Sequence, residues 1–160
     1  MREILISSAV GGLQPGNGSR LLDLPNPLGP VAGIICYELA DGSSIAAATR
    51  EGAEWLLAVA NLDPYPLQLQ RQFLALAQLR AIETSKWLLS VANTGPTAVV
   101  DSSGLVINKL KSDKSIIETM NLRRNQNIST YSRYGEKPMY IFLIVSAIGI
   151  WRNKSNQLLG

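Results

Sequence analysis

The arrangement of apolar and polar positions along most of the chain is that of strands alternating with helices. Three nearly continuous apolar runs have the length of strands: 30–38, 54–61 and 86–93. Runs without polar alternation are typical of strands covered by helices on both faces. Between them, one helix is predicted from Ser43 or Ser44 to about Glu51, and a longer amphipathic helix over 67–85. The pattern therefore predicts an α/β fold built on a parallel sheet.

Weaker patterns surround this central unit. Shorter strands are predicted over 19–24, 97–101, 105–108 and 115–120. Residues 1–10 fit either the end of a helix or a short strand, and 121–129 are polar and loop-like. The glycines of 11–18 follow neither spacing of the common phosphate-binding loops, so turns explain them better than a bound nucleotide does.

The last pattern is an uncharged apolar stretch over 138–151. Lys137 precedes it, and Arg152 and Lys154 follow it. A helix over these residues extends about 21 Å, less than a hydrocarbon core of about 30 Å. Its apolar content and the aromatic residues at its two ends nevertheless favour insertion into a membrane. We predict that it spans a membrane, with the basic residues that follow it on the cytoplasmic side.

These patterns divide the chain into two parts. Residues 1–136 are predicted to form one domain, and 137–160 a C-terminal transmembrane helix with a short cytoplasmic tail. The composition, with 46% hydrophobic and 17% charged residues in a chain of 160, is that of an ordered protein with a single core. The positive-inside rule places this domain and the tail on opposite sides of the membrane.

Charge and residue usage exclude several classes of function. The net charge of +3 is small and the basic residues are scattered, which argues against a nucleic-acid partner. The chain has no histidine and one cysteine, so Ser-His and Cys-His catalytic pairs, the usual zinc sites and an internal disulfide are excluded. We expect neither a metal nor a cofactor.

The single cysteine, Cys36, lies where the first apolar run ends. Ligands bind at the carboxyl ends of strands in open α/β sheets, so this thiol is a candidate nucleophile. The alternative is a structural thiol, because free cysteine is usually buried as a small apolar residue. Glu38 favours the catalytic interpretation, since a carboxylate beside an apolar strand is costly without a polar partner.

Four short motifs follow one another along the chain. They are Ile35–Glu38 around the cysteine, Leu79–Thr84 in the long helix, Ala92–Gly95 with Thr97–Asp101, and Tyr131–Glu136 before the apolar stretch. In this order they resemble the nitrilase-like, carbon-nitrogen hydrolase domain of bacterial apolipoprotein N-acyltransferases, and its C-terminal part only. The resemblance implies the C-terminal half of an α-β-β-α sandwich and one transmembrane helix. It also implies the bacterial inner membrane, with the domain on the periplasmic side.

The resemblance also implies a chemistry and its partners. Cys36 would take an acyl chain from a phospholipid donor as a thioester and pass it to the N-terminal diacylglyceryl-cysteine of an apolipoprotein. The backbone N–H of Tyr37 would help to hold the oxyanion. Tyr37 and Glu38 match positions that the family needs around its nucleophile. Cys36, Tyr37 and Glu38 are therefore the expected catalytic set.

One departure from the family pattern limits this expectation. The family's general-base glutamate and catalytic lysine lie upstream of the stretch that matches 13–16, and the sequence begins almost at that point. We therefore expect a fragment, a split subunit or a decayed copy that is inactive without an upstream half. The alternatives are a non-catalytic remnant or interaction module, and a fragment of a nitrilase-like amidase.

Overall fold

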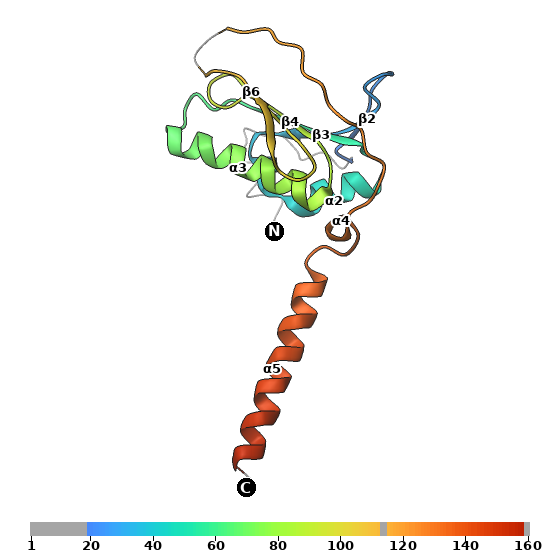
Figure 1. Cartoon of the computed structure of the whole chain (residues 1–160), viewed down its shortest axis with the longest axis vertical. Coiled ribbons are helices and arrows are strands. Elements are labelled where there is room, and N and C mark those ends of the chain that lie inside the picture. The colour runs from blue at the N-terminus through green and yellow to red at the C-terminus, as the bar shows by residue number, and fades with distance from the viewer. Residues whose placement is uncertain (1–18, 113–114, 159–160) are drawn as a thin grey trace, which may run out of the picture.

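The computed structural model describes residues 19–112 and 115–158. They form a six-stranded sheet whose strands lie side by side in sequence order (Figure 1). The strands are β1 (Leu21–Asp23), β2 (Pro30–Ile35), β3 (Trp55–Ala60), β4 (Leu88–Ala92), β5 (Ala98–Val100) and β6 (Val106–Lys109). β2, β3 and β4 are parallel, whereas β1, β5 and β6 pair antiparallel. The parallel centre confirms the predicted α/β class.

Helices cover one face of this sheet. The helices of the described residues are the 3-10 helix η1 (Cys36–Ala40) and the α-helices α2 (Gly42–Arg50), α3 (Leu67–Thr84), α4 (Thr130–Tyr134) and α5 (Lys137–Leu158), of which α2 and α3 cover the sheet. α2 and α3 lie on the same side of the sheet (Figure 1). The carboxylate of Asp41 accepts a hydrogen bond from the backbone N–H of Ser44 at 3.2 Å. Asp41 therefore caps α2, two or three residues before the serines predicted for that role.

Small side chains let the two helices approach the sheet closely. Ala48 of α2 and Ala77 and Ala81 of α3 are almost completely buried. They pack in one cluster with Ile34 of β2 and Leu56 of β3, neither of which is accessible to solvent. Each such aliphatic strand residue contributes about 1.5–3 kcal/mol by its burial. This layer is the core of the domain.

The opposite face of the sheet is open toward the carboxyl ends of its central strands. Side chains alternate along a strand, so Ile35, Val59 and Val91 point away from α2 and α3. They are 66%, 38% and 37% exposed, respectively. The register places Ile35 beside Val59 and Val59 beside Val91, which makes the three side chains one apolar patch. Within the described residues, helices cover one face rather than the predicted two.

The strand predicted over 115–120 is wrong. These residues have irregular backbone, and Ile117 is fully exposed. The segment meets β6 through side chains instead of a backbone ladder: Asn108 Nδ2 donates to Glu118 Oε1 at 2.8 Å. An alternating pattern forms a strand only where its backbone pairs with that of a neighbouring strand. The predictions made for residues 1–18 lie outside the described residues.

A strap formed by residues 124–127 lies along the amino ends of β3 and β4, opposite the end that carries Cys36. Lys86, which is completely buried, donates through Nζ to two strap carbonyls, one of them that of Asn127 at 2.9 Å. Glu54, also buried, accepts a hydrogen bond from the Gln126 amide at 2.7 Å. These bonds fix the path of the chain from the sheet to α4.

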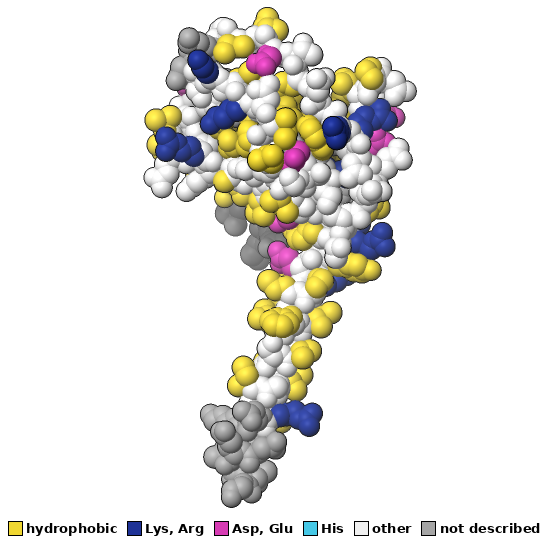
Figure 2. Space-filling model, viewed as in Figure 1, with side chains coloured by type: hydrophobic (Ala, Val, Ile, Leu, Met, Phe, Trp, Pro, Cys, Tyr) yellow, Lys and Arg dark blue, Asp and Glu magenta, His cyan; other side chains and the backbone are white. Residues whose placement is uncertain are grey.

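α5 leaves the domain and extends away from it (Figure 1). Apolar side chains cover much of its length and are exposed, such as Phe142 at 71% (Figure 2). The predicted helix is therefore present. Across 19–112 and 115–158, however, no helix combines the length and apolarity needed to cross a membrane, so the predicted transmembrane span is not confirmed.

We expect Lys86→Ala to lower the free energy of unfolding of the chain by about 2–4 kcal/mol, because it leaves a cavity and two unpaired strap carbonyls. Urea denaturation in mild detergent measures the change. The control is Lys109→Ala, which removes an exposed lysine from β6 and should shift the midpoint little. Equal midpoints for the two variants would show that the strap does not depend on Lys86.

Candidate active site

Cys36 occupies a sharp turn between β2 and η1. Its φ is +52°, a left-handed conformation that residues with a Cβ rarely adopt and that costs on the order of 1–3 kcal/mol. A strained strand-to-helix turn of this kind presents its central side chain at the end of the sheet. The structure therefore places the candidate nucleophile where the sequence predicted it, in a backbone conformation typical of functional sites.

The thiol of Cys36 is free and partly buried against the core. Two asparagines follow the next parallel strands at the same edge of the sheet: Asn61 after β3 and Asn93 after β4. Asn93 Nδ2 donates to Asn61 Oδ1 at 2.8 Å, and Asn93 Oδ1 accepts from the Leu62 N–H at 3.0 Å. This pair fixes the loops beside Cys36. The same triplet, Val-Ala-Asn, ends both strands, a sequence signal that identifies Asn61 as well as Asn93.

Glu38 stabilises the turn through its carboxylate. Its Oε2 accepts a hydrogen bond from the backbone N–H of Ile35 at 2.8 Å and pairs with Arg20. The carboxylate therefore holds the residue before Cys36 in place. Tyr37, the third predicted site residue, is 81% exposed, so its ring takes no part in holding the turn.

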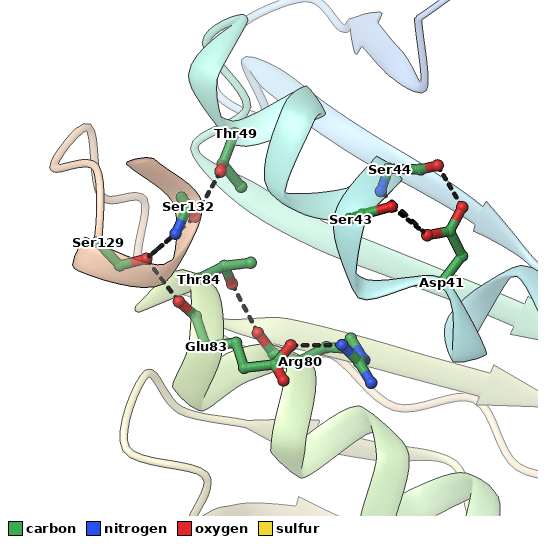
Figure 3. Close-up of polar contacts among 9 residues, drawn as sticks. All are labelled: Asp41, Ser43, Ser44, Thr49, Arg80, Glu83, Thr84, Ser129 and Ser132. Atoms are coloured by element: carbon green, nitrogen blue, oxygen red, sulfur yellow. Dashed lines mark hydrogen bonds and ion pairs between the residues drawn. The ribbon is translucent and has the colours of Figure 1, made fainter. Parts of the chain in front are cut away.

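Asp41 links the end of η1 to the start of α2 (Figure 3). Hydrogen bonds from the Ser44 and Ser43 hydroxyls lower the pKa of this carboxyl to about 2. Arg20 Nη2 lies 3.9 Å from it, so one arginine faces both Glu38 and Asp41. These contacts keep the segment after Cys36 in one conformation.

A cavity of about 640 Å³ adjoins the turn, and we call it the elbow cavity. Ile35 and Glu38, which flank the cysteine in sequence, contribute to its wall. Its apolar lining comes from residues such as Leu22, Leu57 and Val59, and the lining also includes Arg20. The cavity therefore combines an apolar wall with one ion pair. In the part of the chain that the structure describes, no three His, Cys, Asp or Glu side chains cluster as a metal site.

Buried hydroxyls join α4 to α2 and α3 (Figure 3). Thr49 Oγ1 donates to Ser132 Oγ at 2.8 Å, and the Ser132 N–H donates to Ser129 Oγ at 2.9 Å. Ser129 in turn donates to the backbone carbonyl of Glu83. Ser132 is completely buried. The motif at 131–136 therefore has a structural role that the sequence did not reveal.

Arg80 and Glu83 form an ion pair that is largely buried. Arg80 is 7% exposed, and burial raises the pKa of the Glu83 carboxyl. The guanidinium lies against the first residue of α2, where a Cβ on Gly42 would come within 1.8 Å of Arg80 Nη1. Only glycine fits there. The pair thus sets the distance between α3 and the start of α2.

The chain is similar in sequence to curated apolipoprotein N-acyltransferases. A relative from Prochlorococcus marinus strain MIT 9313 is 53% identical over 143 residues, and one from Parasynechococcus marenigrum is 57% identical over 127 residues. These matches cover 89% and 79% of this chain but 28% and 27% of the relatives, so the chain spans little more than a quarter of their length. The resemblance predicted from the motifs is confirmed. No family model matches the chain.

The fold is similar to solved members of the nitrilase superfamily. Nit3 of Saccharomyces cerevisiae, a member of branch 10 of that superfamily, matches with a TM-score of 0.54 and 20% identity, over 66% of this chain and 41% of that one. An amidase from Nesterenkonia sp. matches with a TM-score of 0.51 and 19% identity, over 62% and 40%. At such identities the likeness shows a shared fold, which confirms the nitrilase-like part of the prediction.

Glu38→Ala should increase hydrogen exchange at the Ile35 amide about tenfold, because a hydrogen bond to a charged acceptor contributes about 1.5 kcal/mol. Amide exchange followed by NMR or mass spectrometry measures this. Glu51→Ala removes another carboxylate from the same cavity and serves as the control. Unchanged protection of Ile35 in the Glu38 variant would contradict the assigned role.

The low pKa of Asp41 predicts how the stability of the domain depends on pH. Its folded-state value of about 2 lies below the ordinary 3.8, so its contribution to stability is full above pH 3.8 and is lost as the pH falls toward 2. Asp41→Asn retains a capping oxygen but does not titrate. We expect its melting temperature to fall less steeply over this range than that of the wild-type chain. Parallel curves would exclude Asp41 as the titrating group.

Proposed function

We propose that this chain, a relative of apolipoprotein N-acyltransferases over about a quarter of their length, is the nucleophile-bearing part of a bacterial enzyme of that kind. The observation that carries the proposal is the strained turn at Cys36, which holds a free thiol at the carboxyl end of a parallel strand. The substrates are a phospholipid as acyl donor and the N-terminal diacylglyceryl-cysteine of an apolipoprotein as acceptor.

The reaction has two acyl transfers. The Cys36 thiolate attacks a phospholipid ester carbonyl, a thioester forms, and the lysophospholipid leaves as an alcohol after protonation. The acceptor's α-amine then attacks the thioester, an amide forms, and the thiolate is released as the amine loses a proton. The backbone N–H of Tyr37 stabilises the oxyanion, because the first N–H groups of a helix have no partner within it. The elbow cavity offers apolar wall for the acyl chain.

We propose that the base for these proton transfers comes from another part of the enzyme. The chain contains no histidine. Glu38 already accepts from the Ile35 N–H and pairs with Arg20, so we assign it a positioning role. A positioned general base contributes about 10²–10⁴ in rate. We therefore propose that the remainder of the enzyme, which accounts for most of the length of the relatives, supplies this group.

The open face of the sheet supports the same conclusion. Ile35, Val59 and Val91 form an apolar patch that borders the turn at Cys36. Exposed apolar surface beside a reactive thiol is expected where another layer of protein packs. In an α-β-β-α sandwich, a second sheet covers this face. The proposed upstream half thus completes both the core and the catalytic site.

The exposed apolar helix favours an acyltransferase over the amidase alternative. Ile144, Ile150 and Trp151 are all more than half exposed on α5. Such a surface is costly in water and favourable in lipid. We propose that α5 attaches the domain to the bacterial plasma membrane from the periplasmic side, where it inserts its apolar part among the lipids. This brings Cys36 to the source of its acyl donor.

The chain alone should form no appreciable acyl adduct on Cys36 in phospholipid vesicles. Addition of the complementary part of the Prochlorococcus marinus relative should produce one, since that part would restore the base and the second layer. Mass spectrometry of the intact chain and of its Cys36 peptide measures the adduct, with Cys36→Ser as the control. A stoichiometric adduct on the chain alone would refute the dependence on a second half. No adduct in the complete mixture would favour a non-catalytic remnant.

A further inference from the structure

A second cavity lies at the junction of the domain with α5, and we call it the junction cavity. It has a volume of about 640 Å³ and lies between α2 and the segment that joins α4 to α5. Its lining includes Arg50, Arg133, Glu136, Lys137 and three tyrosines. The proposed acyl transfer makes no use of these residues.

The two cavities lie against different faces of α2. Ser43, Ala46 and Arg50 are spaced by three and four residues and line the junction cavity. The elbow cavity meets α2 at 44, 47 and 48, which share another face of the helix, and also meets Glu51 directly after it. The junction cavity is thus separate from the proposed site of chemistry.

Positive charge dominates the junction cavity. Arg50, Arg133 and Lys137 contribute cations, and Glu136 is the one carboxylate among its lining residues. Glu136 accepts a hydrogen bond from the Tyr140 hydroxyl at 3.1 Å, so its charge is partly engaged. Figure 2 shows basic side chains where the domain meets α5. This combination of guanidinium, ammonium and phenol groups suits a phosphate.

Two hydrogen bonds fix the backbone beside the junction cavity. Arg50 Nη1 donates to the backbone carbonyl of Ser132, which is itself buried against Thr49. The Gly135 N–H donates to the Tyr131 carbonyl at 2.7 Å and closes the turn after α4. These bonds fix Arg50 and the backbone of the turn, from which the exposed side chains of Arg133 and Lys137 extend.

The position of the junction cavity favours a lipid headgroup as the source of the phosphate. Lys137 is the first residue of α5, and exposed apolar residues follow directly at Met139, Ile141 and Phe142. Tyrosines line the same cavity as Lys137. Tyrosine and basic side chains beside an apolar helix are the usual contacts of the headgroup region of a bilayer. A soluble phosphate compound has no comparable relation to the helix.

We propose that the junction cavity binds the phosphate of an anionic membrane phospholipid and so fixes the height and orientation of the domain on the bilayer. The proposal rests on the membrane attachment proposed above for α5. Arg133 and Lys137 contact the phosphate, Arg50 adds positive charge, and the tyrosine rings lie at the interface. The bound lipid is a structural ligand, distinct from the acyl donor.

The first test compares binding of the full chain to phosphatidylcholine vesicles with and without phosphatidylglycerol, measured by flotation. The variant is Arg133→Gln/Lys137→Gln. The control, Arg71→Gln/Lys109→Gln, removes the same charge from exposed residues of α3 and β6. In the first variant, the ratio of binding with and without phosphatidylglycerol should fall about thirtyfold. Each basic residue near a membrane surface contributes roughly fivefold, and the variant removes two of them. The control should retain it.

The vesicle outcomes separate this proposal from the one on which it rests. Binding to both vesicle types with no preference for phosphatidylglycerol overturns the lipid site but leaves attachment by α5 intact. Binding to neither type overturns both proposals. Equal losses in variant and control would mean that net charge, and not the cavity, attracts the anionic lipid, which also overturns the site.

The second test locates the ligand. The full chain in phosphatidylcholine nanodiscs is compared with the chain in discs that contain phosphatidylglycerol, and the amide signal of Gly135 is followed by NMR. We expect a shift with phosphatidylglycerol that is absent in the Arg133→Gln/Lys137→Gln variant. Inorganic phosphate added to phosphatidylcholine discs should leave the signal unchanged. An equal shift with inorganic phosphate would identify a site for free anions and overturn the lipid assignment.

Discussion

The small residues of α2 and α3 allow both helices to pack directly on one face of the sheet, and the other parts of the domain depend on this contact. Ala48, Ala77 and Ala81 are buried there, so the helix axes approach the strands closely. The buried Arg80 sets the spacing between α3 and the start of α2 at Gly42. Because α2 begins only a few residues after Cys36, this packing also determines where the thiol lies.

α2 lies between the elbow cavity and the junction cavity. One of its faces borders the elbow cavity beside Cys36, and another borders the junction cavity at the base of α5. The hydroxyl contact between Thr49 and Ser132 joins the same helix to α4. A rigid helix between the proposed chemical site and the proposed lipid contact relates the position of the thiol to the plane of the membrane. Among the described residues, no helix covers the face that carries Ile35, Val59 and Val91, and this is the face on which the proposed second layer would pack.

The candidate site was predictable where a local pattern carries it. An apolar run that ends in a cysteine predicts both the strand and the position of Cys36. The role of Glu38 was not predictable, because its partners are the Ile35 amide and the distant Arg20. Asn61 was missed as well, although Val-Ala-Asn ends two strands, because nothing local shows that those strands are neighbours.

The sequence by itself determined the central strands and helices, the place of the thiol at a strand end and the family that the motifs resemble. Each of these depends on residues close together in the chain, where apolar spacing and chain turns act directly. Only the tertiary structure decided that helices cover one face of the sheet, that 115–120 is not a strand and that Arg80 and Lys86 are buried. Those outcomes depend on which segments pack together. The local sequence around a charged side chain is the same whether that side chain faces water or a buried polar partner, so it does not reveal burial.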